Sequence, residues 1–203
     1  QERVEKVGEY LPDGGYEIVN FGEAFYQGLS GTFYDANVYI EYTYPYATFV
    51  AIPNVCYKYD FRDPRVCEIE GTKEAFASGA PIQIGGVKQR PAGLGRIYLE
   101  IPVMNKGVGR AKAYINDDFS NLYDEVRFEV NTPGWTCTAR GDPQIVRMAR
   151  AEGLVRETII RCQSDQLEND ALYTAQVDLT LSYYYQDLIS ERIRIKQNPE
   201  LDE

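Results

Sequence analysis

The sequence predicts an all-β protein, a β-sandwich of short strands, and three observations support this. Short segments in which apolar and polar side chains alternate recur along the chain, separated by turns rich in Gly, Asn and Pro. No stretch shows the 3.6-residue period of an amphipathic helix. The 17 Tyr residues cluster in the alternating segments, where a ring with a polar tip suits a half-buried strand. Such a pattern is typical of two packed sheets.

One alternating pattern occurs twice in the chain. Residues 36–55 and residues 173–196 carry it, and the two copies align without a gap. The aligned pairs include Val38 with Val177, Tyr44 with Tyr183 and Tyr46 with Tyr185. Each copy is interpreted as two alternating strands around a short polar turn, which is the signature of a β-hairpin. A repeated hairpin indicates two related β-modules, or one module and part of another.

The predicted domain boundary lies at a Gly- and Pro-containing linker that ends near residue 80. Residues 1–79 are expected to form a smaller β-rich N-terminal segment or partial module that contains the first hairpin. Residues 80–198 are expected to form the sandwich, and residues 199–203 a tail. Near the start of the chain, residues 12–15 predict a turn. Residues 4–10 fit either a short helical turn or an extended lead-in.

The sandwich strands are predicted from alternation and from the turns between them. In order they are residues 82–89 with a Gly bulge, 96–103, 111–115, 123–130, a strand that opens at Trp135, residues 144–149 and 156–162 as a hairpin, and residues 173–196.

The four cysteines fall into two local pairs, Cys56 with Cys67 and Cys137 with Cys162. Each pair flanks a predicted turn, and both separations suit a disulfide that closes a β-loop. A zinc site is the competing interpretation, but the chain has no CxxC knuckle and no His. Reduced buried thiols are the third alternative. Two disulfides predict an oxidising, extracytoplasmic location.

Charge and hydropathy restrict the classes of partner. The formal net charge of −10 and the lack of a Lys/Arg cluster disfavour nucleic acid and anionic membrane surfaces. No apolar run approaches the ~18 residues of a membrane span. The sequence opens on Gln1 and contains no signal peptide, so we expect any export signal or anchor to lie outside it.

Residues 97–111 end in the pattern Asn-Lys-Gly-Val-Gly-Arg-Ala and resemble part of a known family. Adhesion-type (CARDB-like) immunoglobulin-like domains of archaeal and bacterial surface proteins carry a similar Asn-x-Gly-x-Gly turn between two core strands. Residues 173–195 are similar to the closing hairpin of such domains. The resemblance covers residues 81–197 and implies an immunoglobulin-like sandwich in a secreted, surface or filament protein without family-wide catalytic residues. The spacing of Cys137 and Cys162 departs from antibody-type domains, whose inter-sheet disulfide needs a longer separation.

The sequence offers few residues for catalysis or for cofactor binding. The absence of His removes Ser-His-Asp and Cys-His triads and His-ligated metals. No P-loop or dinucleotide-binding fingerprint occurs. The acidic residues Asp117, Asp118, Asp124 and Glu125 are the candidates for a carboxylate pair in glycoside hydrolysis or for a calcium site. A solvated acidic loop is the simpler interpretation, so we expect no enzyme, no cofactor and no metal.

The aromatic strands supply the candidate interaction surface. Alternation places Tyr42, Tyr44 and Tyr46 on one face, and Tyr183 and Tyr185 on one face with Tyr184 opposite. Exposed aromatic faces mark subunit interfaces. Trp135 beside Cys137 fits either an aromatic packed over a disulfide or a platform for a ligand. Arg192, Arg194 and Lys196 give the last strand a basic edge that opposes aggregation or pairs with an acidic neighbour.

The function expected from these observations is that of a non-enzymatic, exported structural protein. It would be a subunit of a cell-surface assembly or an extracellular filament, formed by self-association, with residues 1–79 able to complete a neighbouring subunit's sheet. The alternative is an adhesin or a carbohydrate- or protein-binding module that uses a Tyr/Trp face. A hydrolase with acidic loop residues ranks last.

Overall fold

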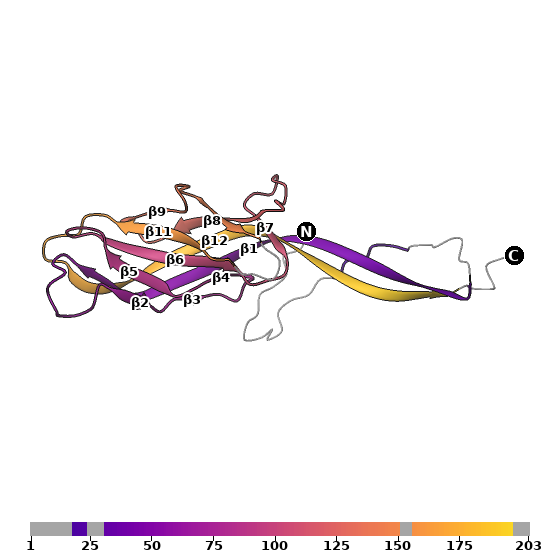
Figure 1. The fold of residues 1–203 in the computed structure, drawn as a ribbon, viewed down its shortest axis with the longest axis horizontal. Helices are drawn as coiled ribbons and strands as arrows, with labels where there is room; N and C mark the ends of the chain where they lie inside the picture. Colours follow the sequence, from indigo (N-terminus) through magenta and orange to yellow (C-terminus); the bar gives the residue numbers. More distant parts are fainter. Residues whose placement is uncertain (1–17, 24–30, 151–155, 197–203) are drawn as a thin grey trace. The chain divides into compact units, whose positions relative to one another are not determined.

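The computed structural model describes residues 18–23, 31–150 and 156–196. The chain divides into two compact units, Tyr39–Ile189 and a smaller unit made of Gln1–Val38 with Ser190–Glu203. No described residue is helical, and the strands form two antiparallel sheets, which confirms the all-β prediction (Figure 1). No helix in the described part of the chain is long and apolar enough to cross a membrane. The predicted turn at 12–15, the segment 4–10 and the tail 199–203 lie outside the described residues.

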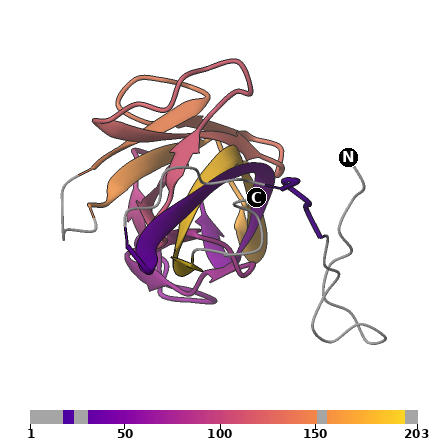
Figure 2. The same cartoon turned by 90° about the vertical axis from the view of Figure 1, so that its right-hand side faces the viewer.

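The first sheet has the strand order β10-β8-β12-β1-β3, and β7 also pairs with β12. The bounds are β1 (Phe33–Lys58), β3 (Phe76–Ala77), β7 (Arg110–Lys112), β8 (Tyr123–Val130), β10 (Ile145–Ala149) and β12 (Leu172–Lys196). The long strands β1 and β12 lie side by side in Figures 1 and 2. They run antiparallel, because Tyr46 contacts Tyr183 whereas the earlier Tyr44 contacts the later Tyr185.

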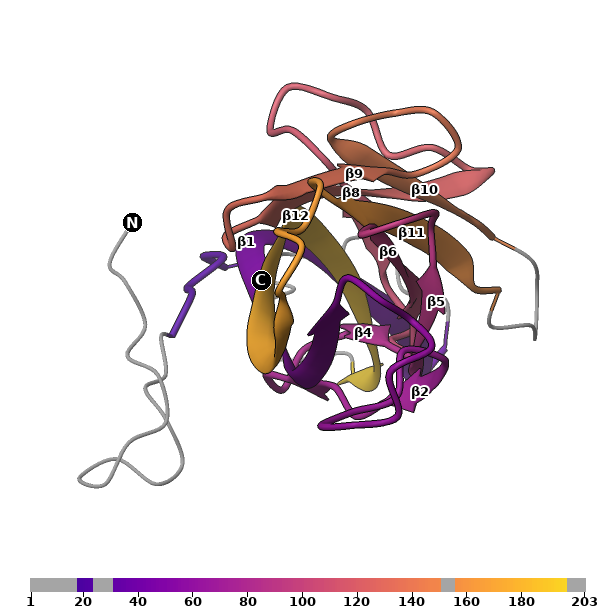
Figure 3. The ribbon, with the colours of Figure 1, turned by 90° about the vertical axis from the view of Figure 1, so that its left-hand side faces the viewer.

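The second sheet has the strand order β2-β5-β6-β11-β9, and β4 pairs with β6. The bounds are β2 (Gly71–Lys73), β4 (Ile82–Ile84), β5 (Val87–Pro91), β6 (Ile97–Asn105), β9 (Trp135–Thr138) and β11 (Thr158–Ser164). The end-on view separates β1 and β12 from β5, β6 and β11 on the other side of the core (Figure 3). This two-layer arrangement is compatible with an immunoglobulin-like domain.

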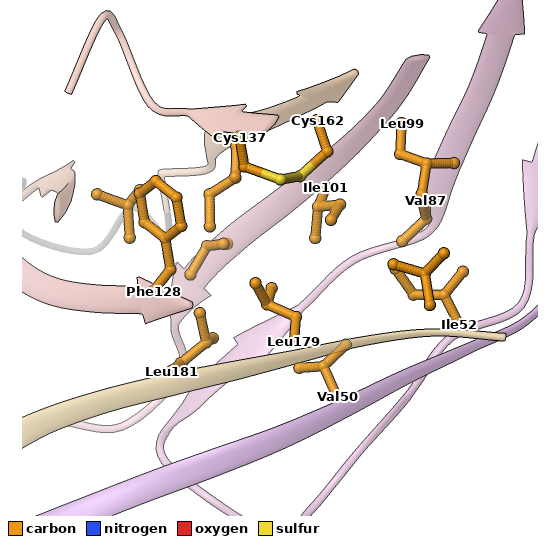
Figure 4. Packing of buried hydrophobic residues seen from close by; sticks show 14 of the residues in the cluster. Val50, Ile52, Val87, Leu99, Ile101, Phe128, Cys137, Cys162, Leu179 and Leu181 are labelled. Carbon is orange, nitrogen blue, oxygen red and sulfur yellow. A yellow bond between two sulfur atoms is a disulfide. The ribbon is translucent and has the colours of Figure 1, made fainter. Parts of the chain in front are cut away.

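The core lies between the two sheets and follows from the alternation in the sequence. Leu99 and Ile101 of β6 face Leu179 and Leu181 of β12, and all four are at most 1% exposed (Figure 4). Tyr98 and Glu100, which alternate with Leu99 and Ile101 along β6, point outward, as a period of two requires. Burial of each such aliphatic side chain stabilises the fold by about 1.5–3 kcal/mol.

The hairpin interpretation of the repeat is wrong. Each copy forms one uninterrupted strand, β1 of 26 residues and β12 of 25 residues, and the two copies pair with each other. The polar positions that predict turns lie inside these strands. A strand continues through such positions when a neighbouring strand satisfies its backbone groups, and this is a non-local effect.

A second predicted hairpin is also wrong. The strand at Ile145–Ala149 pairs with β8 in the first sheet, whereas the strand at Thr158–Ser164 pairs with β6 and β9 in the second. The chain therefore changes sheets between β10 and β11. The predicted turn at 151–153 lies outside the described residues.

The predicted glycine bulge is present at Gly85 and Gly86. Ile84 pairs with Val103 and Lys88 with Glu100, so four steps along one strand match three along β6. This extra residue is a β-bulge, and it divides the predicted strand into β4 and β5. The amide of Gly85 donates to the Pro102 carbonyl at 2.8 Å.

The compact units do not follow the boundary predicted near residue 79. Residues 39–79 contribute β3 and most of β1 to the first sheet and β2 to the second. Their apolar side chains, such as Ile52 and Val55, belong to the same core as Leu99. The compact unit of the sandwich therefore begins at Tyr39.

The smaller unit contains a two-stranded segment of its own. The Asp35 carboxylate accepts hydrogen bonds from Arg192 at 3.0 Å and from Arg194 at 2.7 and 3.0 Å. The Arg194 guanidinium lies 4.5 Å from the centre of the Phe33 ring. These contacts join residues 33–38 to residues 190–196, and the hydrogen bond from Arg194 is the main cause of the lowered pKa of Asp35. The basic edge predicted at Arg192 and Arg194 thus has an acidic partner within the chain.

Candidate functional site

The tyrosines predicted as an interface differ widely in exposure. Tyr183 and Tyr185 are each 2% exposed, Tyr44 and Tyr46 pack against the core, and Tyr42 remains 39% exposed. These five residues form a continuous set of ring contacts, the tyrosine ladder, with centroid separations of 5.8–6.1 Å. Such separations are typical of favourable aromatic pairs. Tyr184 lies half-buried in β12 opposite Lys112 of β7, so Tyr42 and Tyr184 are the members that a partner could reach, and the predicted interface stays a prediction.

The buried hydroxyl groups of the ladder have hydrogen-bond partners inside the chain. The Tyr183 hydroxyl lies 3.2 Å from the Thr48 hydroxyl, and the Tyr46 hydroxyl donates to the Gly79 carbonyl at 2.7 Å. Burial raises the pKa of Tyr183 to about 12, because the tyrosinate would lose its hydration. Burial therefore keeps Tyr183 neutral, and the hydrogen bonds of both hydroxyl groups stabilise the sandwich.

The glycine-rich turn that carries the family resemblance packs directly on Tyr185. The Gly109 amide donates to the Tyr185 hydroxyl at 2.9 Å, and this hydroxyl lies 3.3 Å from Oδ1 of Asn105. Oδ1 of Asn105 also accepts from the Gly107 amide at 2.9 Å, which closes the turn. A Cβ atom on Gly107 would lie 2.1 Å from the Tyr185 hydroxyl, and one on Gly109 would lie 2.2 Å from the Gln186 carbonyl. Glycine is therefore required at both positions, because the turn approaches Tyr185 and Gln186 too closely for a side chain.

Asp124, a candidate acid from the sequence, belongs to this same arrangement. Its carboxylate accepts from the Ala111 amide at 2.8 Å, from Arg150 at 2.8 Å and from Asn105 at 3.1 Å. The Asp124 residue is 4% exposed. We refer to Asn105, Gly107, Gly109, Asp124, Arg150 and Tyr185 as the Tyr185 network.

The other candidate acids do not form a pair with Asp124. Glu125 is bonded to Arg147 at 2.7 Å, while Asp118 is exposed. Lys112 donates to the carbonyl of Asp117 at 2.8 Å, so a cation already occupies this part of the loop. Among the described residues, no group of three or more His, Cys, Asp or Glu side chains is placed to hold a metal ion.

Trp135 packs within an aromatic cluster at the far end of the same two long strands. Its indole nitrogen donates to the Tyr57 hydroxyl at 3.0 Å, and the two rings meet edge to face. Tyr57 also stacks on Tyr173 with centroids 4.9 Å apart. Because its nitrogen is hydrogen-bonded and its ring is packed, Trp135 fits the prediction of a packed aromatic residue beside Cys137 better than that of a platform for a ligand.

Both predicted disulfides are present. Cys137 and Cys162 are direct cross-strand partners in β9 and β11, with a Cα separation of 4.0 Å. Cys56 at the end of β1 is bonded to Cys67, with a Cα separation of 5.8 Å. The bond between β9 and β11 lies within one sheet, so it differs from the inter-sheet bond of antibody-type domains.

Comparison of the chain with protein-family models, with curated proteins and with solved structures finds no match. The function must therefore be argued from the surfaces of the chain itself.

The outer edge of β1 is one feature that the sequence pattern did not predict. On the side opposite β12, β3 pairs with β1 only at Val50 and Ala51, and no other strand of the described chain covers residues 39–48. Tyr39 and Phe49 beside this edge are each 63% exposed. Their odd numbers place them opposite Tyr42, Tyr44 and Tyr46 in the alternation. The sequence does carry a signal for this edge: residues 39–49 have aromatic side chains on both faces, which is unusual for a strand that buries only one face in the core.

Proposed function

We propose that this chain is an exported, non-enzymatic structural subunit that joins further copies of itself in a cell-surface assembly or an extracellular filament. The uncovered edge of β1 carries the proposal. A free strand edge presents unpaired N–H and C=O groups that template pairing with another chain. Exposed Tyr39 and Phe49 beside this edge would be buried by such pairing.

The internal repeat favours a second copy as the partner. The two copies of the repeat already pair with each other in this chain, through contacts such as Tyr44 with Tyr185 and Tyr46 with Tyr183. Because β1 and β12 pair with each other within one molecule, β1 of one molecule is also complementary to β12 of another. If the β1 edge of one copy meets β12 of the next, the contact is heterologous, and heterologous contacts that do not close a ring produce filaments.

Two further observations support an exported, non-catalytic role. The disulfides Cys56–Cys67 and Cys137–Cys162 are of the kind that persists in oxidising compartments. Asp124 and Glu125 are each bonded to an arginine, which favours a structural role for these acids over general acid–base catalysis. The resemblance of residues 97–111 to adhesion-type domains of archaeal and bacterial surface proteins points the same way.

The test is the assembly state of the purified, oxidised chain, followed by light scattering and electron microscopy. We expect regular assemblies above a critical concentration. The double substitution Tyr39→Lys/Phe49→Lys should raise that concentration at least about tenfold, since lysines beside a strand edge oppose pairing. The matched control Leu94→Lys/Leu122→Lys changes two exposed apolar residues away from this edge and should assemble normally.

Two results would contradict the proposal. One is a wild-type chain that stays dispersed at every concentration tested. The other is equal assembly of the two double variants, which would show that the contact between subunits does not involve the β1 edge.

A further inference from the structure

An open groove of about 890 Å³ lies on the outward face of the second sheet. It crosses strands β5, β6, β11 and β9, which lie side by side (Figure 1). The groove is separate from the edge of β1, and neither the tyrosine ladder nor the Tyr185 network lines it. The residues that matter for its chemistry are Arg90, Arg96, Tyr98, Glu100, Arg161 and Gln163.

Strand register places all of these side chains except that of Arg96 in two neighbouring rows. In one row, Tyr98 of β6 pairs with Arg90 on one side and with Gln163 on the other, and Gln163 pairs with Thr136. In the other row, Glu100 pairs with Lys88 and Arg161, and Arg161 pairs with Thr138. The rows are two residues apart along each strand, or ~7 Å. Apart from the ring of Tyr98, both rows consist of polar side chains.

The groove concentrates positive charge in an acidic protein. Three arginines line it against two carboxylates, Glu100 and Asp165, although the chain as a whole carries 31 acidic and 21 basic residues. Glu100 is shared by two arginines at distances beyond a normal hydrogen bond, 3.6 Å to Arg90 and 3.8 Å to Arg161. The two guanidinium groups thus lie near one carboxylate and remain incompletely satisfied.

The hydrogen-bonding groups of the groove are largely unused. Within the described part of the chain, the side chains of Arg90, Arg161 and Gln163 make no hydrogen bond, and Arg96 makes one, to Gln166 at 3.2 Å. A guanidinium offers five N–H donors in a fork that matches a carboxylate. The side chains of Arg90 and Arg161 are 59% and 67% exposed, so a ligand can reach these donors.

Tyr98 adds a requirement that a simple anion does not meet. It is 39% exposed in the middle of its row, with Arg90 on one side and Gln163 on the other. A ligand that uses this position needs an apolar face for the ring and polar groups for its neighbours. A peptide added as a strand across the middle of the groove is disfavoured, because β6 lies between β5 and β11, and β11 lies between β6 and β9.

We propose that this groove binds an acidic oligosaccharide. A sugar ring lies against Tyr98, its carboxylates are held by the arginines, and its hydroxyl groups bond to Gln163 and the neighbouring threonines. This assignment is independent of self-association, since it uses the outward face of the second sheet and not the edge of β1.

The experiment is isothermal titration calorimetry of the full chain at low ionic strength. The probes are the tetrasaccharides of galacturonate, mannuronate and guluronate, with cellotetraose as the uncharged control. We expect saturable binding of at least one acidic probe and none of cellotetraose. Arg161→Gln and Tyr98→Ala should each weaken binding at least about tenfold. Arg147→Gln, which removes an arginine from the first sheet, should leave binding unchanged.

Each remaining outcome would overturn the assignment. Failure of all three acidic probes to bind the folded wild-type chain would do so directly. If inorganic sulfate binds as tightly as the best tetrasaccharide, the groove recognises negative charge alone and not a sugar. A tetraglutamate peptide that binds more tightly would replace the sugar by an acidic peptide. Because Tyr98 and Arg161 are surface residues, circular dichroism should show that both variants are folded. The assembly assay tests the self-association proposal separately.

Discussion

The Tyr185 network and the arginine groove use similar residues in opposite ways. Both contain tyrosine, arginine and carboxylate side chains on neighbouring strands. In the network every polar side chain is bonded inside the chain, and Tyr185 and Asp124 are at most 4% exposed. In the groove, Arg90 and Arg161 are exposed and make no hydrogen bond within the described residues. The difference indicates which region holds the fold together and which is free to bind.

Among substitutions in the Tyr185 network, we expect Gly109→Ala to lower the stability most. In Gly109→Ala the new methyl group would meet the Gln186 carbonyl at 2.2 Å and the Tyr185 ring at 2.5 Å. Since a backbone atom cannot move away easily, we expect the free energy of unfolding to fall by roughly 4 kcal/mol. Urea denaturation below the concentration of self-association measures it.

The matched control is Gly79→Ala. Nothing lies within 4 Å of a Cβ atom at Gly79, and its φ is not in the left-handed region. We therefore expect a change of less than about 1 kcal/mol, of either sign. Equal urea midpoints for the two alanine variants would contradict the close packing of the turn on Tyr185.

Loss of an arginine should destabilise the chain more in the Tyr185 network than in the groove. Arg150→Met leaves the buried carboxylate of Asp124 without its cation, and we expect a loss of about 3 kcal/mol in the free energy of unfolding. Arg161→Met in the groove removes an exposed arginine 3.8 Å from Glu100, and should cost less than about 0.5 kcal/mol. Thermal or urea unfolding of both variants measures the difference. Similar losses in the two variants would show that the groove arginine also stabilises the fold.

The sequence predicted those parts of the fold that depend on local patterns. The strand at Tyr123–Val130 was predicted with its observed bounds, because Val126, Phe128 and Val130 alternate without interruption. The bulge at Gly85 and Gly86 and both cysteine pairs were also predicted. In each case neighbouring residues carry the signal.

The features that were not predicted depend on distant parts of the chain. Pro45 in β1 and the pair Gln186 and Asp187 in β12 look like turns, yet both strands continue because each pairs with the other. The groove was missed for a related reason. Arg90, Tyr98 and Arg161 come together only through the pairing of β5 with β6 and of β6 with β11. Neither pairing can be derived from alternation alone.

Tyr183 is buried beside Tyr185 in the tyrosine ladder, and alkaline pH should destabilise the chain through this residue by less than the Gly109→Ala or Arg150→Met substitution does. The pKa of Tyr183 is about 12 in the folded chain, against an unperturbed value of 10.0. In the unfolded chain the hydroxyl ionises first, so the stabilisation is complete below pH 10 and is lost as the pH rises towards 12. A shift of this size corresponds to about 2–3 kcal/mol. Urea unfolding at a series of alkaline pH values measures the decline.

Tyr183→Phe separates this contribution from those of the other tyrosines. The variant lacks the hydroxyl that lies 3.2 Å from Thr48, so at neutral pH it should be about 1 kcal/mol less stable than the wild type. It has no group to ionise at this position, and its stability should therefore decline less steeply between pH 10 and 12. The two curves should approach or cross as the pH rises. Parallel curves would mean that Tyr183 has the same pKa in the folded chain as in the unfolded chain. Its hydroxyl would then be accessible to solvent, as the groups of the groove are.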